Sequence, residues 1–130
     1  MTERIIFETE MIFLPTSEGG RDIPEGFFQN PRYRPAIVIG DPMQRQVDTS
    51  NIGHLVKMYL LVVLVDGPQH VEHGISVWTK MASIFYWPES HYDAAVPGAT
   101  FTFREGPRII ASGKIARRWK EPYNDDSLAA

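Results

Sequence analysis

The sequence predicts an all-β protein, and three features of its apolar residues support this. Apolar and polar side chains alternate around Phe101 and Phe103, with the two-residue period of a half-buried strand. The continuous apolar run of residues 57–65 is rich in valine, which favours a strand over a helix. Turns that contain glycine or proline separate these segments. We therefore expect less than about 15% helix, below the share in an average globular protein.

The first predicted strand, residues 5–14, has two distinct faces. Four of its side chains should share the face toward the core: Phe7, Thr9, Met11 and Phe13. The alternate side chains should face the other way: Glu8, Glu10 and Ile12. Pro15 ends this strand, and a loop follows over residues 16–24 with a hinge at Gly19 and Gly20. Residues 25–31 extend the loop, and Phe27 and Phe28 within it require burial.

The middle of the chain contains further strands of different character. Pro35 precedes a short second strand, residues 36–39, and the polar residues 44–54 are predicted to be a mobile loop. The run of residues 57–65 is predicted to be a strand buried on both faces. Apolar and polar side chains alternate in residues 75–78, and residues 80–87 form the next predicted strand.

A hairpin over residues 97–115 follows. Phe101 and Phe103 should face the core while Thr102 faces outward, and Gly106 in the turn can adopt a positive φ. Beyond the hairpin, a basic segment surrounds Trp119, and residues 121–130 are polar without an apolar period. We therefore predict one domain over residues 1–120 and a polar, disordered tail over residues 121–130.

Composition limits the classes of function. The 130 residues suffice for one hydrophobic core, and the net charge of −3 predicts no general attraction to nucleic acid. Cysteine is absent, which excludes disulfides and thiolate chemistry and fits a reducing compartment. No apolar run is long enough to cross a membrane, and no signal peptide is evident, so we expect a cytoplasmic protein without a membrane partner.

The hairpin carries a motif with the spacing Phe-x-x-Arg-Glu-Gly-x-Arg-x-x-x-x-Gly. Its matching residues are Phe101, Arg104, Glu105, Gly106, Arg108 and Gly113. This motif resembles the last hairpin of the C-terminal, third domain of elongation factor Tu and its archaeal and eukaryotic relatives. Residues 7–10, 18–21 and 33–35 are similar to the start of the same domain, in the same order. The resemblance covers about residues 5–39 and 78–115, and it implies a closed antiparallel barrel of six or seven strands.

The resemblance also implies a function and a site. In that family the Arg-Glu-Gly turn lies against the T-stem of aminoacylated transfer RNA, and the domain contacts the exchange factor Ts and the GTPase domain. We therefore expect a non-enzymatic binding module for tRNA-like structured RNA or for a translation-linked protein. The alternative is a protein–protein interaction module that mimics or competes for those domain contacts. The predicted binding residues are Gly19, Gly20, Arg21, Arg34, Arg104, Glu105, Gly106 and Arg108.

The RNA hypothesis makes a geometric demand on the turn. Arginine can hold phosphates bidentately, and exposed amides of a turn can approach a sugar–phosphate backbone. Arg21, Arg104 and Arg108 should then lie with Glu105 on one exposed edge, free of mutual salt bridges. In the structural alternative, Arg104 pairs with one of three acidic residues: Glu8, Glu10 or Glu18. The turn has Pro107 where the family typically has a second glycine, which removes one possible donor to phosphate.

Other chemistries find little support in the sequence. No Gly-x-x-x-x-Gly-Lys-Ser/Thr loop is present, so we expect no binding of GTP or GDP, and no other cofactor. His70 and His73 lie three residues apart, which places them on opposite faces of an extended segment, so we predict no metal site. No Gly-x-Ser-x-Gly elbow is present, and a hydrolase that uses His91 and Asp93 is the third alternative.

Overall fold

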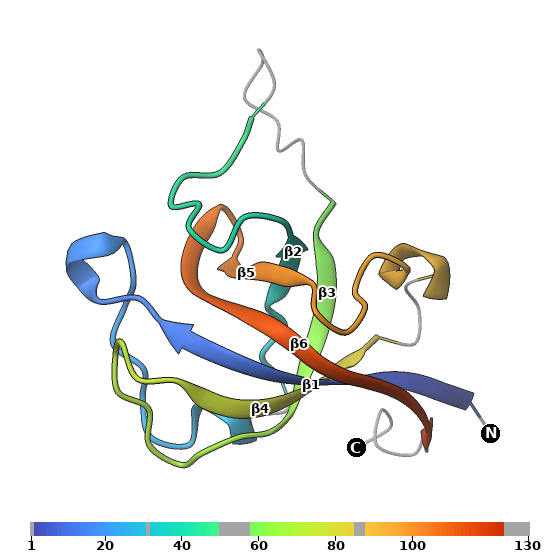
Figure 1. The fold of residues 1–130 in the computed structure, drawn as a ribbon. Helices are drawn as coiled ribbons and strands as arrows, with labels where there is room; N and C mark the ends of the chain where they lie inside the picture. The colour runs from blue at the N-terminus through green and yellow to red at the C-terminus, as the bar shows by residue number, and fades with distance from the viewer. Residues whose placement is uncertain (1, 31, 50–57, 85–87, 124–130) are drawn as a thin grey trace.

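The computed structural model describes residues 2–30, 32–49, 58–84 and 88–123, and these residues form a closed barrel of six antiparallel strands (Figure 1). This confirms the predicted all-β fold class. In the described part of the chain, helical structure is limited to three short 3-10 turns: η1 (Thr16–Glu18), η2 (Phe27–Gln29) and η3 (Glu89–Tyr92). The strands are β1 (Thr2–Phe13), β2 (Ala36–Ile39), β3 (Leu60–Asp66), β4 (Val77–Ser83), β5 (Thr100–Glu105) and β6 (Arg108–Tyr123).

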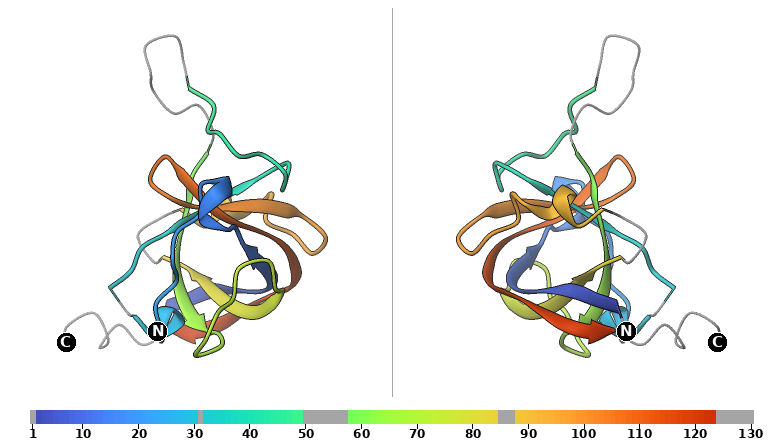
Figure 2. Two further views of the ribbon diagram at one scale, coloured as in Figure 1. Left: turned by 90° about the vertical axis from the view of Figure 1, so that its left-hand side faces the viewer. Right: turned by 90° about the vertical axis from the view of Figure 1, so that its right-hand side faces the viewer.

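The barrel closes in the order β1-β4-β3-β2-β5-β6, with β6 paired to β1. The strands wind around a common interior, which the two side views show (Figure 2). β1 and β6 form the longest seam, from Thr2 opposite Tyr123 to Phe13 opposite Ala111. β6 therefore continues through residues 121–123, which the sequence had assigned to the tail, because these residues pair with the start of β1. The shortest seam joins β2 to β3 at only two paired positions.

Alternate side chains of the strands fill the interior. Phe101 and Phe103 are fully buried in the core, as predicted. The predicted inner face of β1 is also confirmed, because its four side chains are all fully buried: Phe7, Thr9, Met11 and Phe13. The buried hydroxyl of Thr9 forms a hydrogen bond with the hydroxyl of Thr79, at 2.7 Å.

Aromatic residues from the first long loop close one end of the barrel. Phe27 and Phe28 are buried, as the sequence required, and each packs edge-on against Phe13. Gly67 lies directly beneath the Phe28 ring, and a Cβ at this position would come within 2.4 Å of it. This end of the barrel therefore depends on the two rings of Phe27 and Phe28, and on Gly67, where any side chain would displace the Phe28 ring.

Four predicted strands differ from the observed ones. β1 runs from Thr2 to Phe13, where the sequence predicted residues 5–14. Residue 57 of the predicted strand 57–65 lies outside the described residues. In the described part of this run, β3 begins at Leu60, and only alternate residues are fully covered, because one side of β3 faces outward. Residues 77–83 form one continuous strand, β4, where the sequence suggested two segments. Residues 85–87 and 50–54, which belong to a predicted strand and a predicted mobile loop, lie outside the described residues. β2 has the predicted bounds.

Candidate functional site

The turn between β5 and β6 joins the loop around η1 at one end of the barrel. Gly106 has φ +56°, the left-handed conformation that favours glycine in this turn. Arg108 donates from Nε to the carbonyl of Gly19 at 2.9 Å and from Nη2 to that of Gly20 at 2.7 Å. A Cβ at Gly20 would meet the carbonyl oxygen of Leu14 at 1.9 Å. Gly20 therefore lets the loop fold back closely onto its own start at Leu14, and Arg108 holds the folded loop through two of its carbonyls.

An ion pair with two hydrogen bonds completes this contact. Arg21 donates from Nε and Nη2 to the two carboxylate oxygens of Glu105, each at 2.7 Å, which is the strong bidentate arrangement. The hydroxyl of Tyr33 also donates to Glu105. The Arg21 guanidinium lies 5.5 Å from the centre of the Phe27 ring. We call Arg21, Tyr33, Glu105 and Arg108 the turn cluster.

The contacts within the turn cluster shift the pKa values of Glu105 and Tyr33. Burial alone would raise the pKa of Glu105, but hydrogen bonds from Arg21 and Tyr33 outweigh it and lower the pKa below its usual value. Burial, and then the hydrogen bond to Glu105, raise the pKa of Tyr33 far above its usual value. The cluster is therefore held as an ionised carboxylate, a guanidinium and a neutral phenol.

Arg104 does not lie in this cluster, so the prediction of four charged residues on one exposed edge is wrong. Its side chain points away from Phe101 and Phe103, as its place in β5 requires, yet it is fully buried. The second part of that prediction is also wrong, because Arg21 and Glu105 are paired to each other. Arg104 is buried because other residues cover the outer side of β5. The alternation of side chains within one strand does not show whether such a covering layer exists.

The predicted alternative partners of Arg104 are wrong as well. Arg104 donates from Nε to the hydroxyl of Thr102 at 2.9 Å and from Nη1 to the hydroxyl of Tyr59 at 3.1 Å. Glu8 instead pairs with Arg117 at 2.9 Å, and Glu18 lies 3.5 Å from Arg45. The structure thus brings together most of the predicted site residues in and around the turn cluster, namely Gly19, Gly20, Arg21, Glu105, Gly106 and Arg108. Arg34 is exposed beside Tyr33, whose carbonyl it contacts at 3.1 Å.

The histidines named by the sequence lie in separate surroundings. His70 contacts Glu25 at 2.6 Å and lies 3.5 Å from Glu72, and both carboxylates raise its pKa, Glu25 most strongly. His73 contacts the carbonyl of Arg21 at 2.8 Å. Within the described ranges, no three residues of the usual ligand types are grouped to hold a metal ion. His91 lies on η3, and Asp93 follows it.

A second surface, which the sequence did not single out, lies on the outside of β4, β1 and β6, which cross the front of the barrel in Figure 1. We call it the outer face. Its side chains align in cross-strand rows, and directly opposed residues point to the same side. One row joins Trp78, Glu10 and Lys114. The next joins Lys80, Glu8 and Arg117.

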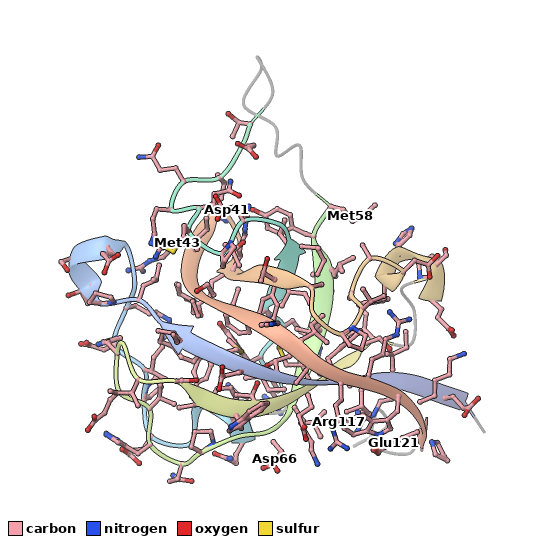
Figure 3. The ribbon with its side chains drawn as sticks, in the orientation of Figure 1. Asp41, Met43, Met58, Asp66, Arg117 and Glu121 are labelled. Atoms are coloured by element: carbon pink, nitrogen blue, oxygen red, sulfur yellow. The ribbon has the colours of Figure 1, made fainter. Side chains whose placement is uncertain are left out.

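Large apolar side chains are exposed on the outer face. Trp78 is 57% exposed and Ile12 is 42% exposed. A hollow of about 280 Å³ lies beside Ile12, with Pro42 and Met43 in its wall and Lys114 at its rim. A smaller hollow of about 90 Å³ lies beside Trp78 and is lined by charged residues, including Asp66. Figure 3 marks Met43 and Asp66 at opposite ends of this surface.

The outer face also contains a fixed aromatic residue. Two cations form cation–π contacts with the Trp119 ring. The guanidinium of Arg117 lies 5.0 Å and the ammonium of Lys80 lies 5.8 Å from the ring centre. Its indole N–H donates to Glu121 at 2.8 Å. Trp119 is therefore held in place by its neighbours, whereas Trp78 projects further into solvent. The sequence did indicate that Glu8, Glu10 and Ile12 share the outward side of the first strand. It could not indicate that they align with Trp78, because that alignment depends on the pairing of β1 with β4.

The chain matches no protein-family model, and no curated protein matches it. Within the described residues, no helical segment has both the length and the apolar character needed to cross a lipid bilayer.

Proposed function

We propose that this protein is a non-enzymatic module that binds another protein through the outer face. The observation that carries the proposal is Trp78, which is 57% exposed on a regular sheet and lies in one cross-strand row with Glu10. Tryptophan is enriched at protein interfaces because it buries a large apolar area while its N–H can still form a hydrogen bond. The apolar hollow beside Ile12 supplies a place for an apolar side chain of the partner.

The outer face has the mixed character of such an interface. Its apolar residues alternate with charges of both signs, so it presents no continuous basic surface for a nucleic acid backbone. Glu8 and Arg117 neutralise each other, and their hydrogen bonds lower the pKa of Glu8. The elongation-factor resemblance suggests a translation-linked protein as the partner.

Contact with structured RNA stays a hypothesis that rests on the resemblance. Three of its predicted arginines are engaged within the protein, since Arg21 is paired with Glu105, Arg108 donates to two carbonyls and Arg104 is buried. A phosphate would therefore have to compete with these contacts. For this reason the outer face supports the protein-binding function better than the turn cluster supports the RNA-binding function.

The test is affinity capture from a lysate of cells that make the protein, with and without nuclease. The variant is Ile12→Ser/Trp78→Ala, and the matched control is Val96→Ser, which changes an apolar residue that is 46% exposed between η3 and β5. We expect a nuclease-resistant partner that the control retains and the double variant loses. A partner that the double variant retains equally would overturn the proposal, and a partner that nuclease removes would favour RNA.

A further inference from the structure

A third hollow adjoins the turn cluster, in the segment between η1 and β2. It has a volume of about 260 Å³ and shares no residue with the two hollows of the outer face. Its exposed rim includes Pro24, Glu25 and Asn30, and its inner wall includes Arg21, Phe27 and Tyr33. Pockets for drug-sized ligands have volumes of roughly 300–1,000 Å³, so this hollow suits a smaller molecule, which can enter past the exposed rim.

Two side chains of the hollow retain hydrogen-bond donors. The Oδ1 atom of Asn30 accepts from the backbone N–H of Arg32 at 3.0 Å. Because a backbone N–H can only donate, this bond fixes the orientation of the Asn30 amide, and its Nδ2 donors have no partner among the described residues. Arg21 forms three hydrogen bonds and also contacts the Tyr33 hydroxyl, so within the described part of the chain at least one of its five N–H groups remains available. Donors of this kind suit a carboxylate.

An acceptor lies at the rim of the same hollow. Glu25 contacts Nδ1 of His70 through Oε1 at 2.6 Å, and its Oε2 has no hydrogen-bond partner within the described ranges. An ionised carboxylate can accept several hydrogen bonds, so Oε2 can receive an ammonium group. Pro24 and the Phe27 ring supply the apolar part of the lining.

The charges around the hollow restrict the charge of its ligand. The guanidinium of Arg21 is paired with Glu105, and the carboxylate of Glu25 contacts His70. A ligand with a single charge would be attracted by one of the two lining groups and repelled by the other. A small molecule that carries both an ammonium and a carboxylate gains from both groups, and its net charge of zero matches these balanced surroundings.

We propose that this hollow binds a free α-amino acid with an apolar side chain. The α-carboxylate accepts from Nδ2 of Asn30 and from Arg21. The α-ammonium donates to Oε2 of Glu25, and the apolar side chain packs against Pro24 and Phe27. This site is independent of the outer face and of the protein-binding function.

The first test is an NMR titration of the isotope-labelled full chain with L-leucine. The backbone amide signals of residues 21–30 should shift in a saturable way, with a dissociation constant of about 1 mM for so small a ligand. Two matched compounds each remove one charge, since isoamylamine lacks the carboxylate and isocaproate lacks the ammonium. Each should bind at least about tenfold more weakly, because a hydrogen bond to a charged group is lost.

Variants of the rim test the role of each polar group. Glu25→Gln should weaken the binding of L-leucine by about tenfold. Asn30→Asp keeps the acceptor for Arg32 and removes the Nδ2 donors, and it should weaken binding by at least as much. The matched control is Glu72→Gln, which removes the other carboxylate near His70 and lies outside the hollow, so it should preserve the affinity. All three positions are exposed, and the melting temperatures of the variants verify that they fold.

Several outcomes overturn the proposal. Two concern the wild-type protein and need no variant to fold: L-leucine causes no saturable shift at ten times the expected dissociation constant, or either analogue binds as tightly as L-leucine. The others concern the rim, where Glu25→Gln or Asn30→Asp keeps the wild-type affinity, or Glu72→Gln loses as much affinity as Glu25→Gln.

Discussion

The turn cluster and the outer face differ in how many of their side chains form contacts within the protein. In the turn cluster, Glu105 accepts from both Arg21 and Tyr33, and Arg108 satisfies two loop carbonyls. On the outer face, Trp78 and Ile12 project into solvent. Glu10 and Lys114 oppose each other across β1 and β6, and neither forms an ion pair with a described residue. Polar groups that are hydrogen-bonded within the protein stabilise its fold. Exposed side chains that lack such contacts can bind a partner.

This comparison reverses the expectation from the sequence motif. The motif directed attention to charged residues at the turn, because arginine and an exposed turn suit phosphate. Those residues hold the Gly19-Gly20 loop against the barrel instead. Variants in the turn cluster should therefore change stability, while variants on the outer face should change binding.

The largest effect is expected in the core. Phe101 is fully buried, and its ring would lie 2.7 Å from a Cβ placed at Gly113, so the site is tightly packed. Phe101→Ala should lower the free energy of unfolding by about 3–5 kcal/mol, because it removes apolar contacts and leaves a cavity. Denaturant titration measures the change. A melting temperature within a degree or two of wild type would contradict the assigned register of β5.

The turn cluster should show the next largest effect. Glu105→Gln removes the charge that Arg21 and Tyr33 share, and should lower the free energy of unfolding by about 1–2 kcal/mol. We take the lower part of the range for such bonds because the Arg21 side chain is 31% exposed and water screens the pair. The matched variant is Glu8→Gln, which breaks the exposed bidentate pair with Arg117 and should cost clearly less. Equal losses in the two variants would contradict a special structural role for the turn cluster.

The same carboxylate should make stability depend on pH. The pKa of Glu105 is lower in the folded protein than its usual value of 4.5. Its contribution is therefore fully present above about pH 4.5, and it is lost as the pH falls through the lower pKa of the folded state. The difference in unfolding free energy between wild type and Glu105→Gln should shrink between pH 6 and about pH 3. A difference that stays constant over this range would show that ionisation of Glu105 does not stabilise the turn.

The sequence predicted local features well because they depend on neighbours in the chain. The bounds of β2, the inward faces of β1 and β5 and the left-handed Gly106 all follow from side-chain period or turn chemistry. The sequence failed where a distant segment decides the environment. Arg104 occupies an outward position of β5, and its burial depends on a layer that includes Tyr59, 45 positions earlier in the chain. The outer face likewise needs the pairing of Glu10 with Trp78, which no single segment encodes.

The smallest effect is expected for RNA binding by the turn cluster. Because Arg108 is already bound to the carbonyls of Gly19 and Gly20, it should contribute little to phosphate binding. We expect labelled transfer RNA to bind no tighter than tens of micromolar by order of magnitude, as at a non-specific site. Arg108→Ala should leave the dependence of the affinity on salt concentration unchanged, whereas loss of a true phosphate contact would reduce the slope by about one unit.

The comparison variant for this titration is Arg34→Ala, which removes an exposed arginine of the predicted site. Both variants and the wild type should be titrated at low and at physiological salt, after their melting temperatures have been measured to exclude unfolding. A reduced slope in Arg108→Ala alone would mean that RNA displaces the loop carbonyls from Arg108. The turn cluster would then be a binding site as well as a structural contact, and the division between the two regions would fail.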